Sequence, residues 1–133
     1  MFKAKDIMTQ PVITVTPDTP IYDAIRLLSS RRLTGLPVVD EDLELVGILT
    51  EKDVLHLLNE HQDRSDQIVA DFMCENVTHF DANDNLIDLC DCLVQNAFRR
   101  LPITEENRLA GIISRSDVID AILKIKHQMP VQG

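Results

Sequence analysis

The chain has 133 residues, 44% of them hydrophobic and 26% charged, which is the composition of a globular domain with its own core rather than of a disordered segment. The formal net charge of -9 at pH 7 disfavours broad binding to nucleic-acid phosphates, although local geometry is able to hold a small anionic ligand. Apolar runs reach only about five residues, against roughly 20 for a transmembrane helix, and no secretory leader is recognisable. We therefore expect a cytoplasmic protein.

In chain order, the first half predicts a strand, a helix, two strands and a closing helix. Val12-Ile13-Thr14-Val15 is rich in β-forming residues, and Thr19 followed by Pro20 predicts an N-cap and a first helical residue. Apolar residues then recur at the spacing of one helix face. The two later strands are short and apolar with an acidic turn between them, as in a hairpin. The expected bounds are 12–15, 20–28, 36–39, 45–49 and 50–58.

Short motifs recur in the second half at a separation of 65 residues, which becomes 64 for Gly47 and Gly111. Asp6-Ile7-Met8 returns 65 residues later as Asp71-Phe72-Met73, and Leu36-Pro37-Val38 returns in the same way as Leu101-Pro102-Ile103. The apolar face of the first predicted helix also recurs in the second half, in a helix whose expected N-cap is Asp84. The second half therefore predicts the same order of elements as the first.

The repeats predict an α/β (α+β) fold made of two pseudo-symmetric β-α-β-β-α units. One unit of about 55 residues exposes too much apolar surface to be stable alone, so we expect the two to pack sheet to sheet around a local two-fold axis. Such packing leaves two related clefts, where small ligands tend to bind. The predicted division is repeat 1 at 1–58, a polar linker at 59–70, repeat 2 at 71–124 and a C-terminal tail at 125–133.

A last repeated motif, GILTEKDV and its later copy GIISRSDV, has two open interpretations. In the structural one, Thr50 or Ser114 caps the closing helix, and Asp53 or Asp117 completes a capping box worth roughly 1–2 kcal/mol. In the functional one, the glycine lets another group approach, and the helix start holds a phosphate. The acid then accepts hydrogen bonds from the two vicinal hydroxyls of a ribose.

The order Asp-Ile-Met-Thr, Leu-Pro-Val-Val-Asp and Gly-Ile-Leu-Thr-Glu-Lys-Asp-Val resembles the cystathionine β-synthase (CBS) domain family. The two copies resemble the family's tandem pair, called a Bateman module, and the resemblance extends from residue 5 to about residue 124. It implies a disc-shaped pair that binds an adenosine compound in its clefts, such as AMP, ADP, ATP, S-adenosylmethionine or NAD.

The resemblance also implies roles for individual residues. Asp53 and Asp117 match the ribose-binding acid of the family, and Thr50 and Ser114 match its phosphate-side hydroxyl. The strand that lines the adenine pocket is matched in both copies, by Pro37 and Val38 and by Pro102 and Ile103.

The two clefts are not expected to be equal. In the second copy Arg115 follows the hydroxyl of the motif and adds charge-assisted bonds to a phosphate, whereas the first copy has Glu51 there, which repels one. Arg99 and Arg100 are similar to the basic pair with which some family members hold phosphates, or alternatively form a solvated helix end. We expect the cleft that contains Asp117 to bind the more highly charged nucleotide.

No catalytic group, metal site or required cofactor is predicted. Cys74, Cys90 and Cys92 lack the spacing of a disulfide framework or a zinc site. The four histidines have no partners at metal-ligand or triad spacing, although His79, on the first strand of repeat 2, is placed to line a cleft. Glycine-rich phosphate loops and nucleophile elbows are absent from the sequence.

These features predict a ligand sensor rather than an enzyme. A nucleotide that prefers a compact arrangement of the repeats shifts the population toward it, and an unidentified effector protein reads the change. We also expect a homodimer through apolar residues of the closing helices, namely Leu55, Leu57, Leu58, Ile119, Ile122 and Leu123. The alternatives are a ligand-free interaction or dimerisation scaffold and a small nucleotide hydrolase.

Overall fold

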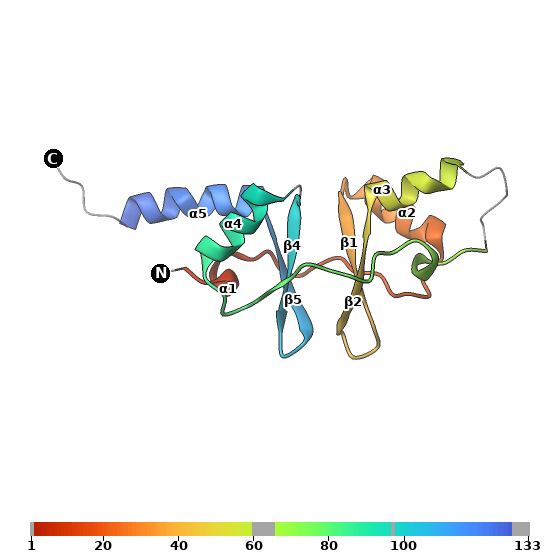
Figure 1. Ribbon diagram of the computed structural model, residues 1–133, viewed down its shortest axis with the longest axis horizontal. Coiled ribbons are helices and arrows are strands. Elements are labelled where there is room, and N and C mark those ends of the chain that lie inside the picture. Colours follow the sequence, from red (N-terminus) through yellow and green to blue (C-terminus); the bar gives the residue numbers. More distant parts are fainter. Residues whose placement is uncertain (1, 60–65, 97, 129–133) are drawn as a thin grey trace. The chain divides into compact units, whose positions relative to one another are not determined.

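The chain forms two compact units (Figure 1). The computed structural model describes residues 2–59, 66–96 and 98–128. Unit 1 comprises Met1–Val12, His79–Glu105 and Ala110–Gly133, and unit 2 comprises Ile13–Thr78 and Glu106–Leu109. Each unit holds most strands and helices of one predicted repeat, together with a segment from elsewhere in the chain.

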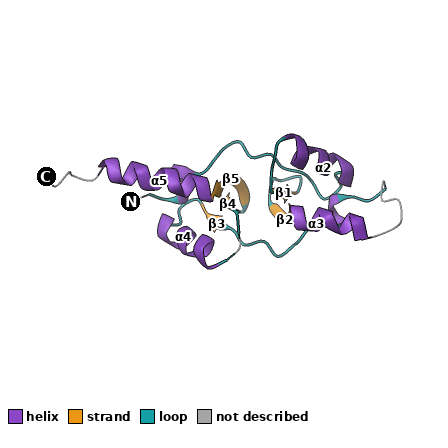
Figure 2. Ribbon diagram, turned by 90° about the horizontal axis from the view of Figure 1, so that it is seen from above, coloured by secondary structure: helices purple, strands orange, loops and turns teal. Residues whose placement is uncertain are grey.

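Unit 2 is built around an antiparallel hairpin of β1 (Gly35–Val39) and β2 (Leu45–Thr50). The helices α2 (Ile21–Ser30) and α3 (Glu51–Leu55) lie on one face of this hairpin (Figure 2). A 3-10 turn, His56–Asn59, continues α3. Both helices thereby cover the apolar side of two short strands.

Two further segments extend the sheet of unit 2 by single bridges. Val15 pairs in parallel with Val38, and Cys74 pairs antiparallel with Ile48. The strand predicted at 12–15 is therefore reduced to one bridging residue. The run lies between two prolines, which cannot donate hydrogen bonds to a ladder and so limit its length.

Unit 1 contains the sheet β3 (Phe80–Asp81), β4 (Arg100–Glu105) and β5 (Arg108–Ser114), in that order. The strand β3 runs parallel to β4. The helices α4 (Leu86–Gln95) and α5 (Arg115–Gln128) lie on the same face of this sheet (Figure 1, Figure 2). The order of elements in repeat 2 is thus the predicted one.

The segment that opens each half of the chain packs within the unit that holds the strands of the other half. In the first half this segment contains the short helix α1 (Ala4–Ile7), and Thr9 pairs antiparallel with Ile112 of β5. The same arrangement in unit 2 is formed by a 3-10 helix, Val69–Asp71. The predicted division at 1–58 and 71–124 therefore differs from the compact units: residues 1–12 belong to the unit of repeat 2, and residues 71–78 belong to the unit of repeat 1.

The predicted linker, 59–70, ends in a folded stretch. Ile68 pairs with Pro20, and Val69 is completely buried in the core of unit 2. Residues 60–65 lie outside the described part of the chain. The linker is polar in composition, but its C-terminal end is fixed to unit 2 by the buried side chain of Val69.

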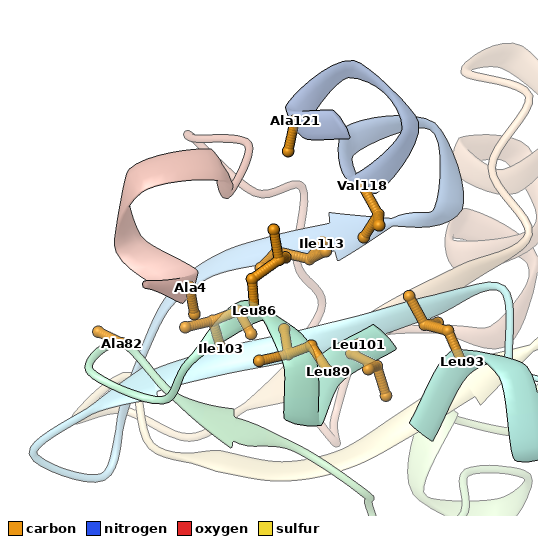
Figure 3. Packing of buried hydrophobic residues seen from close by; sticks show 10 residues of the cluster. All are labelled: Ala4, Ala82, Leu86, Leu89, Leu93, Leu101, Ile103, Ile113, Val118 and Ala121. Carbon is orange, nitrogen blue, oxygen red and sulfur yellow. The ribbon is translucent and has the colours of Figure 1, made fainter. Parts of the chain in front are cut away.

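The core of unit 1 lies between its sheet and its two long helices (Figure 3). Leu101 and Ile103 of β4 point toward Leu89 of α4, and all three are fully buried. The other buried members of this cluster are Ala4, Ala82, Leu86, Leu93, Ile113, Val118 and Ala121. In unit 2 an equivalent cluster gathers around Leu36, Val38 and Leu49.

Both central helices begin one residue later than predicted. Pro20, not Thr19, is the N-cap of α2, and Asn85, not Asp84, is the N-cap of α4. The Asn85 side chain accepts the backbone N–H of Asp88 at 2.9 Å, which is the usual N-cap bond. The Asp84 carboxylate instead accepts the N–H of Asp81 at 2.7 Å, in the turn that precedes the helix.

The closing helix of repeat 2 is longer than predicted. It continues to Gln128, so the predicted tail at 125–133 begins as helix, and residues 129–133 lie outside the described chain. Ile125 packs against the core of unit 1, and basic residues in the last turn complement the helix dipole. The α/β class and the two-repeat organisation are confirmed. Within the described residues, no helix combines the length and apolar character that a bilayer crossing requires.

Candidate functional site

The repeated GILTEKDV and GIISRSDV motifs form a strand-to-helix junction in each unit. In unit 2, β2 ends at Thr50 and α3 begins at the next residue. In unit 1, β5 ends at Ser114 and α5 begins at Arg115. The third helical residue in both cases is the aspartate of the motif. The sequence therefore predicted both junctions correctly.

Asp53 is tied to the start of its own helix through one oxygen only. Its Oδ2 accepts the backbone N–H of Thr50 at 2.8 Å and the Thr50 hydroxyl at 2.9 Å. Its Oδ1 has no hydrogen-bond partner among the described residues. Because the side chain is only half-buried, Oδ1 is available to an external donor.

Asp117 makes the same bonds within its motif and is also bonded by Thr9. Its Oδ2 accepts the backbone N–H of Ser114 at 2.9 Å and the Ser114 hydroxyl at 3.1 Å, and its own N–H donates to Ser114 Oγ at 3.2 Å. The hydroxyl of Thr9 also approaches both carboxylate oxygens, at 3.1 Å from Oδ1 and 3.3 Å from Oδ2. Both oxygens of Asp117 are therefore engaged within unit 1.

The structural interpretation of the motif as a capping box is thus correct. The functional interpretation depends on how many hydrogen-bond acceptor positions each carboxylate still has for a ligand. A carboxylate has about four acceptor positions, so a capping bond on one oxygen does not exclude a ligand hydroxyl on the other. Thr50 and Ser114 each have one hydroxyl proton, which here goes to the aspartate. Either hydroxyl must rotate before it can donate to a phosphate.

The two glycines of the motif make room for methionine. A Cβ atom on Gly47 would lie 2.8 Å from Sδ of Met73, and one on Gly111 would lie 2.6 Å from Sδ of Met8. Both methionines come from the repeated Asp-x-Met motif. The space beside each glycine is therefore filled by the protein itself and gives no support to a ligand.

The predicted cations gather at one end of unit 1. Arg100 opens β4 and Arg115 follows the last residue of β5, so both lie at the same end of the β4–β5 pair. Arg99 precedes β4 and is exposed. None of the three forms an ion pair with a described residue. Their charge is consequently available to an anion.

The corresponding end of unit 2 is less basic, because the exposed Lys52 in the first turn of α3 is offset by its neighbour Glu51. Gly35, in the place of Arg100, pairs directly with Thr50 across the hairpin, and Glu51 opens α3. The helix α3 has only five residues, against 14 in α5, so its dipole contributes less. The first turn of α5 therefore brings Arg115 to its junction, whereas the first turn of α3 brings Glu51 and Lys52 to the other.

The strand residues assigned to an adenine pocket fall on two faces. Val38 and Ile103 belong to the hydrophobic clusters under the helices. Since side chains alternate along a strand, their neighbours Pro37 and Pro102 point to the opposite face, and both prolines are fully buried. His79 is exposed and immediately precedes β3.

Thr9 was not predicted as a site residue. Its hydroxyl meets a carboxylate 108 positions away in the sequence, which no local pattern reveals. The only available signal was its place at the end of the Asp-Ile-Met-Thr motif. Cys74 occupies the same place in the second copy.

A family model described as the CBS domain matches residues 4–60 and 69–124, and each match ends in one of these junctions and its helix. The chain belongs to the CBS domain family. Its similarity to YhcV of Bacillus subtilis, a CBS domain-containing protein, is 34% identity over 119 residues, covering 89% of this chain and 84% of that one. The resemblance seen in the sequence is confirmed.

Similarity extends to longer proteins and to a solved complex. The chain spans 41% of protein MJ1225 and 23% of inosine-5'-monophosphate dehydrogenase, both of Methanocaldococcus jannaschii, and 64% of CBSX2 of Arabidopsis thaliana. Identities to these three are 32%, 35% and 31%, over 86%, 88% and 92% of this chain. The crystal structure of CBSX2 in complex with AMP superposes with a TM-score of 0.85 at 34% identity, covering 95% of this chain and 99% of that one.

Proposed function

We propose that this CBS pair is a cytoplasmic regulatory sensor, not an enzyme, and that it binds an adenosine-containing ligand at its two strand-to-helix junctions. The observation that carries this function is the half-buried carboxylate in the first turn after each junction, with Asp53 Oδ1 open to a donor. The likeness to CBSX2, which was solved with AMP, supports an adenosine ligand.

Each group at the junction has a chemical task in this function. The carboxylate of Asp53 or Asp117 accepts hydrogen bonds from the vicinal hydroxyls of the ribose, which is how an acidic residue recognises ribose in dinucleotide folds. Thr50 or Ser114 rotates its hydroxyl toward the phosphate. Pro37 or Pro102, on the sheet face opposite the buried Val38 and Ile103, contributes an apolar surface for the adenine, and His79 is exposed just before β3. No catalytic group is needed for such recognition.

The junction in unit 1 favours the more anionic ligands, because Arg100 and Arg115 share one end of the sheet and Arg99 is close in sequence. Charge-assisted bonds from guanidinium groups to phosphate are about twice as strong as neutral ones. The junction in unit 2 has Glu51 and Lys52 instead, whose charges offset each other. ATP or ADP therefore suits the Asp117 site, and AMP, S-adenosylmethionine or NAD suits the Asp53 site.

Signalling follows from linkage. A ligand shifts the conformational equilibrium of the pair by no more than its difference in affinity for the two states. An effector protein that contacts one state then responds to the ligand concentration.

Replacing Asp117 by alanine is expected to weaken ATP binding more than replacing Asp53. Loss of a charge-assisted acceptor lowers affinity by about 10- to 100-fold at the affected site, and the site with the arginines contributes most of the ATP affinity. Calorimetric titration of the wild type and both variants measures the effect. Asp71→Ala is the matched control, because Asp71 also accepts a backbone N–H, from Ile68 at 3.0 Å, but lies outside the junctions.

Three results would contradict this assignment. Equal losses from the two substitutions would remove the asymmetry between the sites. Failure of AMP, ADP, ATP, S-adenosylmethionine and NAD to bind or to raise the melting temperature would favour a ligand-free interaction scaffold. Metal-dependent ATP turnover by the purified protein would favour a nucleotide hydrolase.

We further propose that the closing helices form a homodimer surface. Ile119, Ile122 and Leu123 on α5 are 60%, 55% and 54% exposed, and Leu55 and Leu58 are exposed near the end of repeat 1. Leu57, also predicted for this surface, packs against the core of unit 2 instead. Exposed apolar groups of this kind mark interaction surfaces. The variant Ile119→Asp/Leu123→Asp is expected to halve the mass measured by light scattering. Ile87→Asp on α4, where Ile87 is 56% exposed, is expected to keep it; a wild-type monomer would refute the dimer.

A further inference from the structure

Thr9 and Cys74 occupy matched positions in the two units. Thr9 exchanges backbone hydrogen bonds with Ile112 at 2.8 and 3.2 Å, and Cys74 exchanges them with Ile48 at 2.9 Å in both directions. Ile112 and Ile48 each stand two residues before the hydroxyl of a junction. The backbones beside the two carboxylates are therefore equivalent, and the side chains differ.

The side chains at this position make different bonds. The Thr9 hydroxyl donates to Asp117, whereas the thiol of Cys74 is directed to the backbone oxygen of Asn76, at 3.7 Å. A thiol is a weak donor, and no hydrogen bond from it reaches Asp53. Asp117 thus accepts a hydrogen bond from Thr9, outside its own motif, whereas Asp53 keeps one oxygen without a partner among the described residues.

We propose that the Thr9 and Cys74 pair sets the sugar specificity of the two sites, an inference that rests on the proposed adenosine-binding function. At Asp53, the free Oδ1 and the capped Oδ2 accept both ribose hydroxyls. At Asp117, the proton of Thr9 occupies the acceptor capacity that one of these hydroxyls needs. The Asp53 site therefore requires both ribose hydroxyls, whereas the Asp117 site accepts one of them, gains the rest of its affinity from the phosphates and tolerates a 2'-deoxyribose.

The test compares AMP with 2'-deoxy-AMP at one site at a time. Asp117→Ala leaves the Asp53 site, and Asp53→Ala leaves the Asp117 site. At the Asp53 site, 2'-deoxy-AMP is expected to bind about 10-fold or more weakly than AMP, because a hydrogen bond to a charged acceptor is lost. At the Asp117 site the two ligands are expected to bind within about threefold of each other.

Exchanging the two side chains should exchange the preference. In the Asp117→Ala background, Cys74→Thr supplies a hydroxyl to Asp53 and is expected to bring the AMP preference down to about threefold. In the Asp53→Ala background, Thr9→Val removes the hydroxyl at nearly constant shape and is expected to raise the preference to about 10-fold. Cys74→Val has the shape of threonine without its hydroxyl, so it separates steric effects from hydrogen bonding.

The outcomes distinguish this inference from the function on which it rests. If AMP binds in neither background while both variants stay folded by melting temperature, both are overturned. If AMP binds but the preference is the same at both sites and is unchanged by Thr9→Val, the specificity role is overturned and the sensor function stands. If AMP binds in one background only, the substitution of Thr9 or Cys74 at that site decides whether the hydroxyl sets the sugar preference. An equal effect of Cys74→Val and Cys74→Thr also overturns the role of the hydroxyl.

Discussion

Leu89→Ala is expected to lower the free energy of unfolding by about 3 kcal/mol. Leu89 is fully buried on α4, facing Leu101 and Ile103 of β4, so truncation leaves a cavity that the surrounding side chains cannot fill (Figure 3). Chemical denaturation followed by circular dichroism measures the change. The expected value is large because the transfer energy of the lost methyl groups and the cost of the cavity add.

The control for Leu89 lies on the same helix. Val94 is 83% exposed, and Val94→Ala is expected to change stability by no more than about 0.5 kcal/mol. Both substitutions leave the helical propensity of α4 similar or better, so the difference between them reports burial. Similar losses from the two variants would contradict the placement of α4 over the sheet of unit 1.

Gly111→Ala is expected to destabilise unit 1 by about 1–3 kcal/mol through overpacking. The added Cβ would lie 2.6, 2.7 and 3.0 Å from Sδ, Cγ and Cβ of Met8, so rotation of the methionine tip alone does not relieve the contact. The Met8 backbone must shift, and with it the neighbouring Thr9 that bonds to Asp117. Thermal and chemical denaturation measure the loss.

A double-mutant cycle tests the cause. Met8→Ala removes the atoms that clash, so Met8→Ala/Gly111→Ala is expected to cost at least about 1 kcal/mol less than the sum of the two single changes. Additive losses would show that the glycine is required for a reason other than its contact with Met8. The same cycle can be repeated at Gly47 and Met73, where an added Cβ would lie 2.8 Å from the methionine Sδ.

Local sequence patterns were sufficient for the repeated framework. The hairpins, the apolar helix faces and both strand-to-helix junctions depend on residues that are close in sequence, and the internal repeat supplied a second example of each. The helix starts were displaced by one residue, because Asn85 and Asp84 are both good caps and only the fold decides between them.

The segments exchanged between units could not be predicted in this way. Val69 is buried beside residues of repeat 1, and Thr9 bonds to Asp117 across 108 positions. Such contacts are set by tertiary packing, and the polar residues around Val69 favour a linker when only the sequence is considered. The glycines were misleading for a similar reason, since the space beside each is filled by a methionine from another segment, Met8 at Gly111 and Met73 at Gly47.

A crystal structure of the chain grown with AMP tests the central claim most directly. The expected result is a ribose whose hydroxyl oxygens lie about 2.5–3.0 Å from a carboxylate oxygen of Asp53 or Asp117. AMP bound elsewhere, or absent at saturating concentration while both aspartates keep only the bonds to their own motif and to Thr9, would contradict it.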